Sequence, residues 1–134
     1  MEMQGRVADG ISFLDARRPH WFGDNLLNIH TSWHRAIFAL EQETPAEALA
    51  LFDEVMAGPD ALGAALPMAD STSLLWRLHL DGVDVGGRWG LLADAWAEKD
   101  TTPWYVFNDL HALMALIGRS EEHTSELQSR QCIS

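Results

Sequence analysis

Residues 25–41, NLLNIHTSWHRAIFALE, decide the fold of this 134-residue chain. Leu26, Ile29, Trp33, Ile37 and Leu40 recur at intervals of three and four residues. That spacing places all five side chains on one face of an α-helix with 3.6 residues per turn. The segment therefore predicts an amphipathic helix that buries one face against neighbouring elements.

Residues that cap or break helices mark the elements on either side. Asp24 suits the N-cap of this helix, and Pro45 suits the first turn of a second helix that extends to about Met56. Residues 57–69 are rich in Gly, Ala and Pro and are expected to form a loop. The DSTS stretch at 70–73 is typical of an N-cap, so a third helix is expected to begin there.

The remaining segments also show helical patterns. Residues 1–18 predict a short helical hairpin with its turn between Gly5 and Gly10. Apolar stripes follow at Leu74, Leu75 and Leu78, at Trp89, Leu92, Ala93 and Trp96, and at Val106, Leu110, Leu113 and Ile117. No segment alternates polar and apolar residues as a strand does. The chain is thus expected to be all-α, with antiparallel helices joined by short breaks.

Composition excludes several classes of partner. Nine basic and twenty acidic residues give a net charge of −11, which disfavours binding to nucleic acid phosphates or to an anionic membrane surface. No apolar run reaches the roughly 18 residues of a membrane-spanning helix. The opening MEMQGRVADG has neither the basic start nor the apolar stretch of a signal peptide, so a cytoplasmic location is expected.

The last sixteen residues, RSEEHTSELQSRQCIS, differ in character from the rest. Residues 119–129 resemble the in-frame translation of a common high-throughput sequencing adapter. We expect residues 119–134 to be a disordered tail of artefactual origin and residues 1–118 to be the folded domain. The only cysteine, Cys132, lies in this tail, so residues 1–118 can form neither a disulfide nor a thiolate metal site.

The helix pair over 25–56 partly fits the 34-residue tetratricopeptide pattern. Ala36, Ala48 and Phe52 take the eighth, twentieth and twenty-fourth positions, where that pattern has two small residues and an aromatic one. Ser32 and Pro45 replace the aromatic residues usual at the fourth and seventeenth positions. The match predicts antiparallel helix pairs stacked as a tetratricopeptide-like α-α superhelix.

Three longer blocks carry a more specific resemblance. HTSWHRAIFALE (30–41), DSTSLLWRLHLDGVDVGGRW (70–89) and FNDLHALMAL (107–116) resemble the tetratricopeptide repeat protein 38 family, in the order found in that family. Members of the family are much longer. The resemblance implies that residues 1–118 are a C-terminal fragment that packs on missing upstream repeats, and that Met1 is an internal residue.

The resemblance also implies a binding surface. In tetratricopeptide folds the first helix of each pair lines a concave groove, which here assigns His30, Trp33, Ile37, Leu40 and Glu41 to that groove. Such a surface suits a peptide or protein partner better than a nucleic acid. One alternative is that these side chains are exposed only because the repeats that would cover them are missing. Another is that the chain serves only as the C-terminal cap of a longer solenoid.

A pair of histidines raises a second hypothesis, that of a metal-dependent enzyme fragment. His30 and His34 lie one turn apart on the predicted helix, and His111 is the nearest candidate for a third ligand. Thr31 stands where a zinc protease of the HExxH type needs its glutamate, so that class is excluded. The alternative is that these histidines only form hydrogen bonds within the helix packing.

The expected function is therefore a non-catalytic protein-interaction module without a cofactor. Phosphate-binding glycine loops, calcium loops and nucleophile motifs of the GxSxG type are absent from the sequence. The metal-dependent enzyme fragment is the alternative.

Overall fold

The computed structural model describes residues 4–25, 27–99 and 106–131, and every regular element in them is helical. The elements are α1 (Val7–Ala16), α2 (Arg18–Trp21), α3 (Asn28–Glu41), α4 (Pro45–Leu51), the π-helical turn η2 (Phe52–Met56), α5 (Pro59–Leu62), α6 (Ala65–Leu80), α7 (Arg88–Ala97) and α8 (Val106–Gln131). The all-α prediction is confirmed for this part of the chain.

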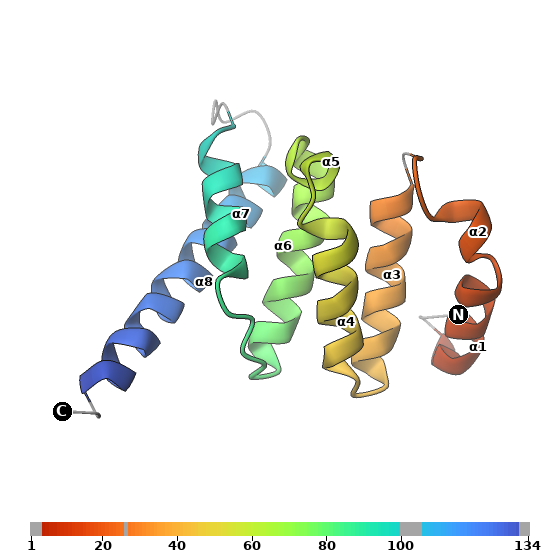
Figure 1. Ribbon diagram of the computed structural model, residues 1–134, viewed down its shortest axis with the longest axis horizontal. Helices are drawn as coiled ribbons and strands as arrows, with labels where there is room; N and C mark the ends of the chain where they lie inside the picture. Colours follow the sequence, from red (N-terminus) through yellow and green to blue (C-terminus); the bar gives the residue numbers. More distant parts are fainter. Residues whose placement is uncertain (1–3, 26, 100–105, 132–134) are drawn as a thin grey trace.

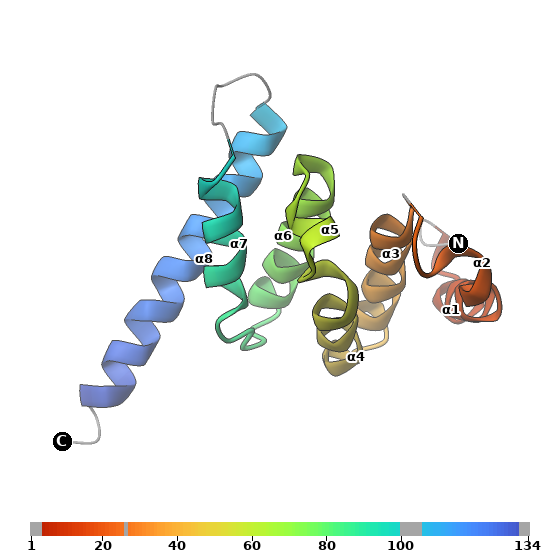
Figure 2. The ribbon, with the colours of Figure 1, turned by 45° about the horizontal axis from the view of Figure 1, so that its top comes forward.

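The helices stand side by side in a row that runs from α1 and α2 at one end to α7 and α8 at the other (Figure 1). The longer helices alternate in direction: α3, α6 and α8 run one way, and α4 and α7 run the other (Figure 1). Helix α3 packs on α1, α4 and α6, whereas α8 packs on both α6 and α7. A tilted view shows the C-terminal half of α8 extending beyond the row (Figure 2).

Helix α3 begins later than the sequence suggests. Its N-cap is Leu27 rather than Asp24, and the backbone N–H of Leu27 donates a hydrogen bond to the Asn25 side chain (2.9 Å). Leu26 lies outside the described residues. The buried face of α3 is set by small residues, with Ser32, Ala36 and Ala39 fully enclosed. Small side chains let α3 approach its neighbours closely.

The core lies between α3, the α4–η2 segment, α6 and α7. Its largest fully buried side chains are Trp89, Phe52, Met56, Met68, Leu74, Leu75, Leu78 and Leu92. The small residues Ala36 and Ala48, aligned in the sequence with the small positions of the tetratricopeptide pattern, are also fully buried, as is Phe52. Close contact between α3 and α4 therefore depends on small side chains, while Phe52 fills the space beside them.

The start of α6 corrects the sequence analysis. Residues 57–69 were expected to be a loop with DSTS as the N-cap, but α5 occupies 59–62 and α6 begins at Ala65. Pro67 is compatible with this start because the first turn of a helix leaves its N–H groups unbonded. Ser71 and Thr72 therefore lie in the middle of α6, and both are buried. Ser71 Oγ donates to the carbonyl of Met56 (3.1 Å).

The N-terminal hairpin also differs from expectation. Gly10, expected beside a turn, lies within α1 and is buried. A Cβ atom at this position would overlap the ring of Phe38 on α3. The glycine thus serves close packing between α1 and α3, and the break in the segment lies at Arg17 instead.

The expected disordered tail is helical, because α8 continues to Gln131. Its residues are mostly good helix formers, such as Glu, Gln, Leu and Arg. Two polar contacts join this extension to the row of helices: an ion pair of Arg119 with Asp94 of α7 (2.8 Å), and the approach of His79 Nε2 of α6 to Glu121 Oε2 (2.9 Å). The adapter origin of residues 119–134 and the domain boundary at 118 remain predictions.

A glycine also sets the contact between α8 and α7. Gly118 is buried, and a Cβ atom there would overlap the indole ring of Trp89. The Trp89 ring is itself 98% buried and meets the Trp76 ring edge to face at 6.2 Å. The ring therefore has little room to move away.

We predict that Gly118→Ala destabilises the fold by about 1–3 kcal/mol, because the added methyl group overpacks this contact. Gly90→Ala on α7 is the matched control, since a Cβ there meets open space. That control should gain about 0.5–1 kcal/mol from higher helix propensity. Urea unfolding followed by circular dichroism measures both. Equal effects of the two substitutions would contradict the packing assignment.

A buried hydrogen bond joins α6 and α7. The indole N–H of Trp96 donates to Thr72 Oγ1 (2.9 Å), and that hydroxyl donates to the carbonyl of Met68 (2.7 Å). Thr72 is fully buried and Trp96 is 4% exposed. Water therefore has no access to the indole N–H if the hydroxyl is removed.

We predict that Thr72→Val costs about 1–3 kcal/mol of stability, because it leaves a buried donor without an acceptor. Thr124→Val on α8 removes a hydroxyl that donates to the Ser120 carbonyl in an exposed position. That control should change stability by less than about 0.5 kcal/mol. Thermal unfolding of the two variants compares them directly. A Thr72→Val variant as stable as the control would show that this hydrogen bond contributes little.

Candidate functional site

An open pocket of about 710 Å³ lies where α3 and α6 end. Its lining residues are Ile37, Leu40, Glu41, Glu43, Pro45, Arg77, Leu80, Asp81 and Val83. They come from the C-terminal half of α3, the turn into α4, the end of α6 and the loop that follows α6. The pocket therefore depends on the packing of α3 against α6.

Both helices end in the same type of turn. Glu43 (φ 57°) and Gly82 (φ 74°) adopt left-handed backbone conformations one residue beyond each C-cap. The N–H of Thr44 bonds to the Ala39 carbonyl, and the N–H of Val83 bonds to the Leu78 carbonyl, both at 2.9 Å. These are Schellman motifs, which satisfy the last carbonyl groups of a helix. They turn the chain sharply at the rim of the pocket.

The pocket has an apolar floor and an acidic rim. Ile37 is buried, Leu40 and Val83 are half-buried, and Leu80 is 70% exposed. The carboxylates of Glu41, Glu43 and Asp81 are the acidic groups of the lining. Two helix C-termini add partial negative charge at the same place. The site thus combines apolar contact area with a negative electrostatic potential.

Arg77 is the one cationic residue of the lining. Its guanidinium lies 5.5 Å from the centre of the Trp33 ring, a cation–π distance. The Trp33 indole N–H in turn donates to Ser73 Oγ at 2.7 Å. Two side chains of α6 therefore hold Trp33 at the junction between α3 and α6.

The five groove residues expected from the resemblance divide into two groups. Ile37, Leu40 and Glu41 line the pocket. His30 and Trp33 lie nearer the N-terminus of α3, outside the pocket. Their rings stack on each other with centroids 5.8 Å apart, and His30 Nδ1 lies 3.1 Å from Asp70 Oδ2 on α6. The structure places all five on one helix, whereas their role in binding a partner remains a prediction.

The three candidate metal ligands do not form one site. The rings of His30 and His34 are 4.7 Å apart in an edge-to-face arrangement, while His111 lies on α8 and bonds to the Phe107 carbonyl at 2.7 Å. Within residues 4–25, 27–99 and 106–131, no three His, Cys, Asp or Glu side chains are placed to hold a metal ion. His111 therefore does not supply the third ligand that the hypothesis requires.

Sequence analysis missed the part of the pocket that α6 contributes. Arg77, Leu80, Asp81 and Val83 become neighbours of Leu40 only when α3 and α6 pack in a particular register. The sequence does show a leucine beside polar residues at the end of α6, which could indicate a surface site. It does not show that α3 is the helix that completes the pocket.

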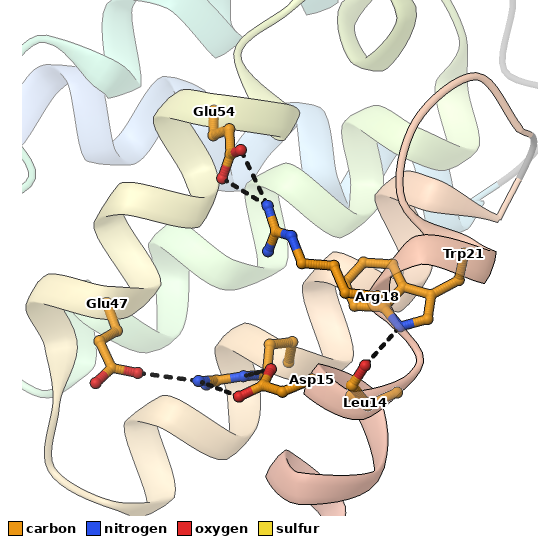
Figure 3. A network of polar contacts seen from close by, with 7 residues as sticks. Leu14, Asp15, Arg18, Trp21, Glu47 and Glu54 are labelled. Atoms are coloured by element: carbon orange, nitrogen blue, oxygen red, sulfur yellow. Dashed lines mark hydrogen bonds and ion pairs between the residues drawn. The ribbon is translucent and has the colours of Figure 1, made fainter.

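Polar contacts of α1 and α2 with α3 and η2, and of α3 with α4, hold the N-terminal helices in place (Figure 3). Arg35 of α3 pairs with Asp15 (2.8 Å) and Glu47 (3.2 Å), while Arg18 bonds to both carboxylate oxygens of Glu54 (3.0 and 3.1 Å). Burial lowers the pKa of Arg35, but its hydrogen bonds to the two carboxylates outweigh this effect and keep the pKa above its usual value. The network joins α1 and α2 to the pocket-forming helices.

A second hollow lies between the α6–α7 loop and α8. Its lining combines apolar residues such as Val83 and Trp89 with the polar side chains of His79, Asp84, Glu121, Glu122, Glu126 and Arg130. Burial raises the pKa of Glu122, and the carboxylates of Glu126 and Asp84 add to this effect.

No protein-family model matches the chain, and no solved structure matches it significantly. Among the described helices, none is both long and apolar enough to cross a membrane.

A bidentate ion pair clamps η2 to the start of α7. Arg88 Nε and Nη2 lie 2.8 and 2.6 Å from the two carboxylate oxygens of Asp53. The hydrogen bonds from Arg88 hold the pKa of Asp53 below its usual value. A lowered pKa means that the folded state favours the ionised carboxylate, so the pair stabilises the fold above the unfolded-state pKa of about 4.

We predict that Asp53→Asn lowers stability at pH 7 by less than about 1 kcal/mol, since the carboxylate is half exposed and screened by solvent. The difference from the wild-type chain should shrink as the pH falls through the folded-state pKa, below about 4, where Asp53 becomes protonated. Urea unfolding at pH 7, 5 and 3 measures this. Asp60→Asn on α5 controls for the loss of one charge, and an identical pH profile for both variants would contradict the prediction.

Proposed function

We propose that this chain is a non-catalytic protein-interaction module that binds a peptide or protein segment in the pocket between α3 and α6. The observation that carries this proposal is an apolar floor with an exposed leucine, Leu80, beside two helix C-termini and three carboxylates. Small, partly apolar pockets with a few polar groups are typical binding sites.

The order of helix contacts supports a tetratricopeptide-like arrangement. Helix α3 pairs with α4 and η2, and α6 pairs with α7, while α6 also packs on α3 and α8 packs on α6 and α7. Stacked helix pairs in a solenoid make contacts of this kind. We therefore retain the α-α superhelix, the relation to the tetratricopeptide repeat protein 38 family and the role as a C-terminal fragment of a longer chain as parts of the proposal.

Charge defines the partner that we propose. Among the described residues that line the pocket, Glu41, Glu43 and Asp81 are acidic and Arg77 is basic. The Arg77 guanidinium lies over the Trp33 ring. A segment that combines basic and apolar side chains would complement both the rim and the floor. The net charge of −11 favours the same partner and disfavours nucleic acid. We expect the chain to be cytoplasmic and its partner to be a protein or peptide.

No observation favours the alternative of a metal-dependent enzyme. His30 bonds to Asp70, and the described residues provide no third ligand near the two histidines. Contacts of His30 with α6 fit a role in helix packing.

Selection from a phage-displayed library of random 12-residue peptides tests the proposal. We expect the wild-type chain to enrich peptides that contain Lys or Arg next to apolar residues, with dissociation constants in the micromolar range. Leu80→Lys should weaken the selected peptides at least tenfold, because it removes apolar contact and adds a positive charge to an acidic pocket. Fluorescence anisotropy with the synthetic peptides measures the loss.

Leu66→Lys is the matched control. Leu66 lies at the other end of the same helix and is as exposed as Leu80, at 69% against 70%. Because both side chains are largely exposed, neither substitution should prevent folding. Failure to enrich any peptide, or equal binding by the two variants and the wild type, would overturn the proposed function.

A further inference from the structure

Helix α8 turns its large apolar residues outward. Val106, Leu110, Leu113 and Ile117 were expected to be the buried stripe of this helix, yet they are 75%, 54%, 52% and 37% exposed. The opposite side of α8, with Ala115 and Gly118, is the one that packs on the row. Helix α8 is the last helix of the row, and its C-terminal half extends beyond the row (Figures 1 and 2).

The spacing of the stripe indicates that a helix covers it. The four residues are separated by four, three and four positions, which is the a/d spacing of a coiled-coil seam. A contiguous exposed apolar surface of this kind commonly marks a protein–protein contact. The four side chains lie over about three turns of the helix, or roughly 17 Å.

The same spacing is symmetric, as the contact between two copies of one helix requires. The intervals of four, three and four read the same in both chain directions, so a half-turn about the midpoint of the stripe exchanges Val106 with Ile117 and Leu110 with Leu113. A two-fold dimer requires a patch that is complementary to itself in this way. We propose that a second copy of this chain covers the stripe, with the two α8 helices antiparallel.

Residues beside the stripe fit the same symmetry. The half-turn also exchanges Leu116, which is 53% exposed, with Phe107, whose ring lies 4.4 Å from the His111 ring in a tilted arrangement. Asp109 is the one charged residue between 106 and 117, so two copies would bring few like charges together at the seam. Repulsion between the copies then comes mainly from their net charge of −11. Added salt should therefore strengthen the dimer by screening this repulsion.

Sedimentation equilibrium of the full chain from about 1 to 200 µM tests the proposal. We expect a monomer–dimer equilibrium whose dissociation constant falls when NaCl is raised. The double variant Leu110→Glu/Leu113→Glu should raise the dissociation constant at least tenfold, because it places four carboxylates at the centre of the seam. Leu66→Glu on α6, an exposed leucine outside the stripe, should leave the dissociation constant unchanged. Circular dichroism of each variant establishes that it is folded.

Disulfide formation tests the direction of the two helices. In a Cys132→Ser background, which removes the only natural cysteine, Val106→Cys and Ile117→Cys chains are prepared separately. An antiparallel dimer cross-links a mixture of the two chains, but neither chain with itself, because like positions are then separated by roughly 17 Å. Cross-linking of each chain with itself would show a parallel pair.

Three results would overturn the proposal. The first is a monomer over the whole concentration range, in which case only a different helix could cover the stripe. The second is a dimer that Leu66→Glu weakens and Leu110→Glu/Leu113→Glu does not. The third is cross-linking of like cysteines only. None of these results depends on whether the pocket between α3 and α6 binds a peptide.

Discussion

Close approach of helices at alanine and glycine positions is the constraint on which this structure depends. Ala36, Ala39 and Ala48 are fully buried between α3 and its neighbours, while Gly10 and Gly118 leave room for the rings of Phe38 and Trp89. A side chain at either glycine would push two helices apart. These contacts hold α1 on α3 and α8 on α7, and the packing of α3 on α6 brings the ends of those two helices together at the pocket. The small-residue side of α8 faces inward for the same reason.

Local sequence was sufficient to predict the elements whose signals are short in range. The helix over α3 and the break before Pro45 follow from periodicity and proline geometry. Ile37, Leu40 and Glu41 were assigned to a groove through the resemblance to a known family, and they line the pocket. Their assignment required only the register of one helix.

Features that depend on two elements could not be predicted in the same way. The DSTS stretch has the chemistry of an N-cap, but Ser71 and Thr72 find carbonyl partners inside a longer α6, so tertiary contacts replace the local signal. On α8, the hydrophobic stripe was the side expected to face the core. Steric fit sets the orientation of the helix instead, because the Trp89 ring packs against Gly118, where a Cβ atom would overlap it. Hydrophobicity alone does not distinguish an inner face from a face that covers a partner.

The two proposed surfaces differ in chemistry because they arise from different parts of the helices. Helix ends expose partial negative charge and turn residues, so the pocket between α3 and α6 is acidic at its rim and suits a basic segment. The α8 stripe lies along the side of a helix, where no backbone charge is exposed. Its side chains are those of valine, leucine and isoleucine, so the stripe is apolar and suits another helix. The pocket and the stripe share no residue. A dimer formed through α8 would therefore leave each pocket with its full lining, and would present two pockets to one partner.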